Sequence, residues 1–204
     1  MSISKQVSSS PGYSLELTLK QEELGYIKEE ISKQWLNRLL IQDKNLISYI
    51  SSKNISIEEY HHISNRIEHS KIWSKNSRIL WPSFNKCLED TDFYKKLKTN
   101  FGDFIVSDEE NLGWPNFYWR ITRPKESQDI GPVHRDSWFW KLNDQFIKPK
   151  YPFFRVKVWI AIYSEPGKNG LLVEPDSHKR KDIIWDSNLR DGIAKPLLDE
   201  DKNI

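Results

Sequence analysis

Cysteine and long apolar runs are both scarce in this sequence. Its single cysteine, Cys87, excludes a disulfide within the chain and fits a reducing compartment. No apolar stretch approaches the roughly 18 residues that a membrane-spanning helix needs. Residues 1–11 are polar and serine-rich, without the apolar core of a secretory signal. We therefore expect a cytoplasmic protein that has no membrane partner.

A large charge of one sign is lacking too. The chain carries 31 Lys and Arg against 29 Asp and Glu, a net charge of +2, which does not imply a polyanionic partner. Its longest basic cluster, Lys179–Lys181, is explained more simply as a solvated loop. Nucleic acid is therefore not an expected partner, and the oligomeric state stays open.

The sequence is rich, by contrast, in tryptophan. It has nine, of which five fall between Trp114 and Trp159. Tryptophan is usually packed in a core or a pocket wall. A length of 204 residues favours one domain, residues 1–204, with a sizeable core.

The first part of that domain, about residues 15–105, has a helical pattern. Apolar residues recur at steps of three and four from Leu24 to Leu39, after a capping-box spacing of Thr18 and Gln21. This predicts a long helix that ends near Asp43. The stripe consists of Leu24, Ile27, Ile31, Trp35 and Leu39.

Two further helices are predicted. A second capping box, Ser56 and Glu59, opens a helix over about 57–73, and a shorter helix begins after Thr91 and ends by Gly102. Three histidines in the segment at 57–73 are expected to be structural or solvated: His61, His62 and His69.

The second part, about residues 113–204, has a β-rich pattern. Short runs of β-branched and aromatic residues between Pro and Gly predict strands at Phe117–Thr122, Phe153–Tyr163 and Leu171–Glu174, with a further run at Ile193–Leu198. Helices followed by strands favour an α+β fold, with a β-sandwich or barrel supported by the N-terminal helices.

Chemistry is indicated by the segment Gly131–Trp138. In an extended backbone, His134 and Asp136 project to one side while Arg135 turns away. A His-x-Asp pair is the local part of the two-histidine, one-carboxylate triad that holds Fe(II). Alone it is a weak signal, because such pairs are more often hydrogen-bonded at a surface. A kinase catalytic loop is excluded, since it needs Asn where Lys141 stands.

A companion segment raises the specificity of this pair. Val158–Tyr163 is an aliphatic run, and Asn169–Lys179 contains an Asn-Gly turn, a short strand and a Pro-Asp-Ser-His-Lys sequence. In this order, over Trp114–Lys181, the chain resembles the phytanoyl-CoA dioxygenase family. It departs from the family pattern at Asp176, where Gly is usual.

The resemblance implies a double-stranded β-helix, the cupin-like jelly roll, with residues 113–204 as an incomplete one. It also implies a dioxygenase that uses Fe(II) and 2-oxoglutarate to hydroxylate a small molecule, with His134 and Asp136 as iron ligands. In the family the second iron-binding histidine comes later, so it is expected beyond Ile204, which would leave this 204-residue form with poor or absent activity. His178 is a less favoured third ligand.

Several further residues are candidates for binding. Those proposed to contact the cofactor are Tyr118, Arg120, Lys157 and Trp159, because a buried cation in a barrel needs an anion to offset its desolvation. They equally fit a solvent-facing or ion-paired role. Trp138 and Trp140 form either a substrate wall or ordinary core.

Two alternatives remain at this stage. One is a non-catalytic cupin-like module whose tryptophan-rich pocket holds a small ligand. The other is a β-sandwich interaction domain without a metal.

Overall fold

The computed structural model describes residues 1–74, 76–142, 154–165, 167–190 and 192–202. Its α-helices are α1 (Ile3–Ser8), α2 (Gln21–Gln42), α3 (Lys44–Lys53), α4 (His69–Ile72), α5 (Pro82–Glu89), α6 (Asp92–Phe101) and α7 (Asp136–Leu142). Its 3-10 helices are η1 (Ile57–His62), η2 (Ser64–Arg66), η3 (Asn76–Arg78), η4 (Ser127–Asp129) and η5 (Ser177–Lys179), and its strands are β1 (Trp185–Arg190) and β2 (Ile193–Leu198). The predicted mixture of helix and sheet is therefore confirmed.

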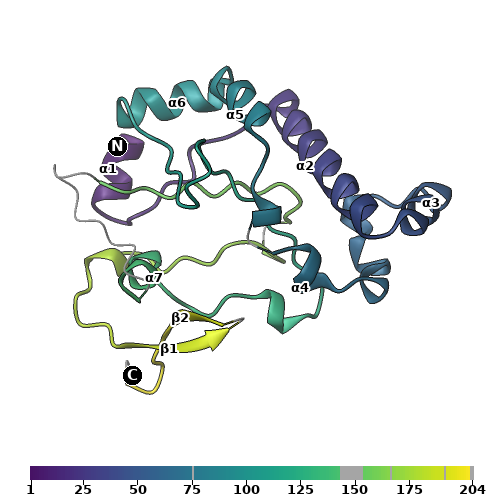
Figure 1. The fold of residues 1–204 in the computed structure, drawn as a ribbon. Helices are drawn as coiled ribbons and strands as arrows, with labels where there is room; N and C mark the ends of the chain where they lie inside the picture. The colour runs from purple at the N-terminus through teal and green to yellow at the C-terminus, as the bar shows by residue number, and fades with distance from the viewer. Residues whose placement is uncertain (75, 143–153, 166, 191, 203–204) are drawn as a thin grey trace.

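The elements fall into two groups in space. Figure 1 shows α2, α5 and α6 along one side of the molecule, and α7 with the β1–β2 hairpin on the opposite side. Irregular segments run between the two groups. The helical group comes from the first half of the chain and the hairpin group from the second.

Helix α2 follows its apolar stripe. Ile27, Ile31 and Leu39 are buried along one face, as predicted. The expected cap was wrong, because the helix begins at Gln21 with Lys20 as its N-cap. The Glu23 carboxylate accepts the Lys20 N–H at 2.7 Å and also accepts the N–H of Asp92, at the start of α6, at 2.6 Å. Glu23 thus serves the N-termini of two helices, a tertiary contact that local spacing does not encode.

Helix α6 matches its prediction at both ends. The Thr91 hydroxyl accepts a hydrogen bond from the Tyr94 N–H at 3.1 Å, which satisfies a first-turn donor. Gly102, with a φ of 71°, ends the helix in a conformation that costs other residues more.

The segment 57–73 is the main correction among the helices. Its capping box is confirmed, since Glu59 accepts the Ser56 N–H at 3.0 Å, but the helix breaks into η1, η2 and α4. The buried Tyr60 hydroxyl bonds to His69 Nδ1 at 3.0 Å. In one straight helix those positions would lie about 13 Å apart along the axis. The segment folds back to make this bond.

Of the predicted strands, Ile193–Leu198 is confirmed as β2. It pairs antiparallel with β1, a strand that was not predicted, in a register from Trp185 opposite Leu198 to Arg190 opposite Ile193. The connection includes Gly192, with a φ of 75°.

The other three strand predictions are wrong for the described residues. In segments 117–122, 154–163 and 171–174 the structure has one isolated bridge, between Ile79 and Tyr118. A strand forms only where a neighbour completes its hydrogen-bonded ladder. Segment 117–122 makes two backbone hydrogen bonds with residues 78–80, too few for a ladder, and segments 154–163 and 171–174 pair with no strand in the part of the chain that is described. Phe153 lies outside that part. The described residues contain one two-stranded sheet and no jelly roll.

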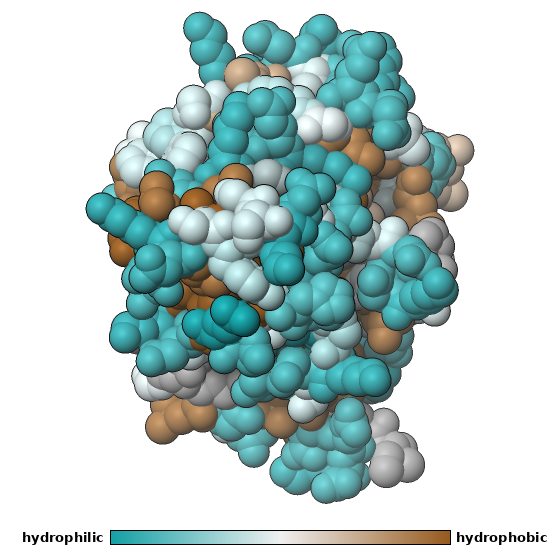
Figure 2. Space-filling model, turned by 90° about the vertical axis from the view of Figure 1, so that its right-hand side faces the viewer, coloured by the Kyte–Doolittle hydropathy of each residue, from teal (hydrophilic) through white to brown (hydrophobic). Residues whose placement is uncertain are grey.

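The apolar core belongs to the first half of the chain. Its buried cluster extends from Ile27 to Trp119, with Trp35 and Leu39 at its most enclosed positions. Beyond Trp119, the described residues add one large buried apolar side chain, Trp138. Leu172, by contrast, is 97% exposed. Figure 2 shows one face of the molecule, where apolar patches lie between hydrophilic side chains.

Candidate metal centre

His134 and Asp136 bring their side chains together. His134 Nε2 lies 3.5 Å from Asp136 Oδ1. The side chains are 39% and 32% exposed, so solvent reaches both. The backbone differs from the expectation, because Asp136 is the first residue of α7 rather than part of a strand. The two groups nevertheless point to one place.

The imidazole of His134 is held by a backbone carbonyl. Its Nδ1 lies 2.6 Å from the Pro132 oxygen, which can only accept, so Nδ1 carries the proton of this bond. Asp136 Oδ1 can only accept, so Nε2 bonds to it when the ring is protonated, and loss of that proton leaves on Nε2 a lone pair that faces the same place. A carbonyl or carboxylate on the far nitrogen is the usual arrangement behind a metal-binding histidine.

The Asp136 carboxylate has a different partner on each oxygen. Oδ1 faces His134, and Oδ2 lies 2.6 Å from Lys157 Nζ. The bond to His134, followed by the bond to Lys157, lowers the pKa of Asp136 to about 2. The bond to Asp136 raises the pKa of His134 above its usual value. The carboxylate is therefore ionised at neutral pH and available to a cation.

Arg120 reaches Gly131, in the loop that leads to His134. Its guanidinium donates to the Asp129 carbonyl. A Cβ placed on Gly131 would lie 3.8 Å from both Arg120 Nη1 and His134 Cε1. Arg120 and the imidazole of His134 therefore both approach the same glycine.

A buried ion pair shapes the loop that leads to His134. Asp129, whose side chain is 5% exposed, accepts Arg123 Nε and Nη2 at 2.8 Å each and the Arg123 N–H at 2.9 Å. His69 Nε2 lies 3.8 Å from the same carboxylate. This network joins the helical group to the loop at 123–131. Sequence spacing offered no signal for it.

The side chain of Arg135 turns away from the pair, as predicted, and makes hydrogen bonds to another segment. It donates to the Arg180 carbonyl at 2.9 Å and to the Ser177 carbonyl, both in the turn that contains η5. Its guanidinium lies 5.5 Å from the ring centre of Trp138. The segment between the two candidate ligands is thereby tied to residues more than 40 positions away.

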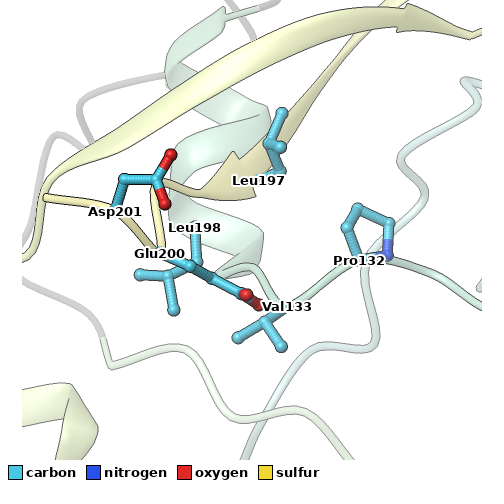
Figure 3. A pocket seen from close by; sticks show the side chains of 6 residues that line it. All are labelled: Pro132, Val133, Leu197, Leu198, Glu200 and Asp201. Atoms are coloured by element: carbon cyan, nitrogen blue, oxygen red, sulfur yellow. The ribbon is translucent and has the colours of Figure 1, made fainter. Parts of the chain in front are cut away.

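A hollow of about 330 Å³ adjoins the segment that carries the pair. Pro132 and Val133, directly before His134, form one wall, and the Leu198 N–H donates to the Val133 carbonyl at 2.8 Å. Figure 3 shows the six side chains that line it: Pro132, Val133, Leu197, Leu198, Glu200 and Asp201. Its volume lies at the small end of the range for ligand pockets.

Other candidates are placed elsewhere. Tyr118 donates to Glu110 at 2.8 Å, and Trp159 lies over Gly170, 3.7 Å from the Cβ position there. The imidazole of His178 lies against Gly12, where an added Cβ would be 2.3 Å from Nδ1. None of these contacts brings the three residues to His134 and Asp136.

The two tryptophans after the pair are packing residues in this structure. Trp138 is 5% exposed and stacks on Trp185, with ring centres 5.4 Å apart. Trp140 is half-buried, and the guanidinium of Arg155 lies 4.3 Å from its ring centre. Neither side chain lines the hollow beside His134.

The donor set fits a divalent cation in part. Imidazole and carboxylate are ligands that Fe(II) accepts, and His134 and Asp136 supply one of each. Within the described residues, no group of three or more His, Cys, Asp or Glu is arranged to hold a metal. The pair offers one imidazole and one carboxylate, fewer than the three protein ligands of the family triad.

None of the helices described is long and apolar enough to span a membrane.

A comparison with known protein families matches residues 27–196 to Phytanoyl-CoA dioxygenase (PhyH). No curated protein and no solved structure matches significantly. Because the family match covers most of the chain, including His134 and Asp136, this protein belongs to the phytanoyl-CoA dioxygenase (PhyH) family, a family of oxygenases.

Proposed function

We propose that this protein is a non-haem dioxygenase that uses Fe(II) and 2-oxoglutarate to hydroxylate a small molecule. The observation that carries the proposal is the convergence of His134 and Asp136, 3.5 Å apart, in a chain of this family. The carbonyl of Pro132 supports it, because it fixes the ring nitrogen that faces away from Asp136.

The two side chains would hold Fe(II) through His134 Nε2 and Asp136 Oδ1. Neighbouring ligands of an octahedral ion lie about 3 Å apart when each bond is about 2.1 Å, so the observed separation needs only a small adjustment. Lys157 now pairs with Asp136, but its side chain is 70% exposed and free to move toward solvent. A bound cation would take over its role of neutralising the carboxylate.

Two cations beside the pair would bind the carboxylates of 2-oxoglutarate. Arg120 and His134 both approach Gly131, and Lys157 Nζ bonds to Asp136 Oδ2. Arginine suits a carboxylate because its planar fork donates two parallel hydrogen bonds. When bound, iron and 2-oxoglutarate together supply the oxidation of a C–H bond by O2. The chain supplies the ligands, the two cations and the adjoining hollow.

The fold and location belong to the same proposal. We assign the second half of the chain to the double-stranded β-helix that the family implies, with the β1–β2 hairpin as one of its strand pairs. The proposed location of the protein is the cytoplasm, because the reaction requires iron in its reduced form.

Anaerobic titration with Fe(II) tests the ligand assignment. Asp136→Ala is expected to weaken binding by at least about 100-fold, because it removes one of two protein ligands. Asp103→Ala changes an exposed aspartate outside the site and serves as the matched control. Equal affinity of Asp136→Ala and the control variant would reject the assignment. Succinate release that depends on 2-oxoglutarate then tests the reaction.

A second function is favoured by one observation, the lack of a third ligand near the pair among the described residues. A non-catalytic module of the same fold would bind a small ligand without turnover. Iron binding with no succinate release at any 2-oxoglutarate concentration would support this module over the dioxygenase.

A further inference from the structure

Arg135 sits between the two candidate ligands, and its side chain reaches a distant part of the chain. We propose that Arg135 is a positioning residue that holds His134 and Asp136 in their convergent geometry by fastening their backbone to the turn at residues 177–180. This inference rests on the proposed metal site. It assigns a function to a residue that faces away from that site.

The geometry explains why this position matters. Any rotation of the backbone at Arg135 moves the residues on both sides of it, so it changes the separation of the imidazole and the carboxylate. The guanidinium donates to two carbonyls, those of Ser177 and Arg180, and packs over Trp138 one turn further along α7. A planar group with several fixed donors resists such rotation better than a single ammonium does.

The turn that receives Arg135 is itself anchored on its far side. Asp176 has a φ of 58°, a left-handed conformation that Asp tolerates better than most residues. Its N–H donates to the Pro11 carbonyl at 2.7 Å, and its carboxylate accepts from Ser10 at 3.0 Å and from Lys179 at 2.7 Å. The N-terminal segment therefore stabilises the turn whose carbonyls accept hydrogen bonds from Arg135.

This arrangement connects two segments that are about 40 residues apart in sequence. The segment at Ser177 serves the site through its backbone carbonyls rather than through the imidazole of His178. Asp176, which stands where the family usually has Gly, keeps the left-handed turn and adds side-chain bonds to Ser10 and Lys179. The metal pair, the turn and the N-terminal segment form one connected unit.

Binding of Co(II), observed by its visible absorption, tests the proposal without requiring turnover. Arg135→Ala is expected to weaken Co(II) binding about 10- to 100-fold, the usual cost of losing a group that orients a ligand. Arg135→Lys is expected to recover only part of this, because the ammonium cannot reach both carbonyls with fixed geometry. Arg66→Ala, which removes an exposed arginine stacked on Tyr49, is the matched control and should bind as wild type does.

Hydrogen exchange, measured without metal, separates this proposal from the proposed function. In Arg135→Ala, backbone amides at 133–138 and 177–180 should exchange at least about 10-fold faster, while those of α2 stay unchanged. Wild-type affinity for Co(II) in a folded Arg135→Ala protein would overturn the proposal, and so would unchanged exchange in both segments. Failure of the wild type to bind Co(II), with faster exchange in the variant, would reject the iron site but retain the tether.

Discussion

The two halves of this chain solve the problem of burying apolar side chains differently. In the first half, α2, α5 and α6 surround a cluster from Ile27 to Trp119, and Leu39 is completely enclosed. In the second half, the expected strand at 171–174 keeps its apolar side chains at the surface, as Leu172 shows, and Ile160 and Ile162 are only half-buried against the helical cluster. A helix satisfies its own backbone and needs only one covered face, whereas a strand needs neighbours at both edges. The helical half therefore contributes most of the buried apolar core, and the proposed metal ligands lie in the less buried second half.

The largest expected difference in stability is between the loss of a leucine from the first half and the loss of one from the second. Leu39→Ala should lower the free energy of unfolding by about 4 kcal/mol, because it leaves a cavity in the helical core. Leu172→Ala, at a side chain that is 97% exposed, should change it by less than about 0.5 kcal/mol. Urea unfolding of both variants measures this contrast. Similar losses in the two variants would mean that the second half is packed as tightly as the first.

A smaller effect is expected at the Arg123–Asp129 ion pair, whose carboxylate also faces His69 of the helical half. Asp129→Asn should cost about 3 kcal/mol, because it leaves the guanidinium of Arg123 enclosed without its charge partner. Asp182→Asn, at an aspartate that is 75% exposed and 3.6 Å from Arg180, is the control and should cost less than about 1 kcal/mol. Thermal unfolding compares them, and equal midpoints would show that the pair does not couple the halves.

The smallest expected effect is a dependence on pH at the same junction. Burial lowers the pKa of His69. The positive charges of Arg123 and Arg78 lower this pKa further, and the negative charges of Asp129 and Glu126 oppose the shift. The unfolded chain therefore takes up a proton near pH 6.5 while the folded chain does not. The contribution of His69 to the free energy of unfolding is therefore fully present above about pH 6.5, and it is lost as the pH falls toward the pKa of His69 in the folded chain.

His69→Gln should remove on the order of 1 kcal/mol of this dependence between pH 7 and 5, measured by urea unfolding at each pH. His61→Gln, at an exposed imidazole, should leave the profile as in wild type. A profile for His69→Gln identical to wild type would place the pH dependence at other groups.

The sequence predicts the helical half better than the second half for a physical reason. Helix α6 was predicted at both ends because Thr91 and Gly102 act on their immediate neighbours. The break in segment 57–73 was missed because its cause is a bond between Tyr60 and His69, which depends on the fold of the whole segment. The strands were mispredicted because the residues of 171–174 favour extended backbone but do not supply a partner.

The site shows the same division. The meeting of His134 and Asp136 was predictable, since two positions separate them and both are short polar side chains near the backbone. Arg120 was identified as a candidate, whereas the tie from Arg135 to the turn at 177–180 was not, because it spans more than 40 residues. His178 was considered as a ligand on its residue type alone, and the structure places it against Gly12.

The most direct test of the metal centre compares histidines in the two halves by NMR. The protein, with its five histidines labelled with ¹⁵N in the ring, is titrated with substoichiometric Mn²⁺, a paramagnetic ion that accepts the same ligands as Fe(II). The ring signals of His134 should broaden first, those of His69 should stay sharp, and Asp136→Ala should abolish the difference. Broadening of all five histidines together, or a His134 signal that stays sharp at stoichiometric Mn²⁺, would contradict the assignment of His134 and Asp136 as metal ligands.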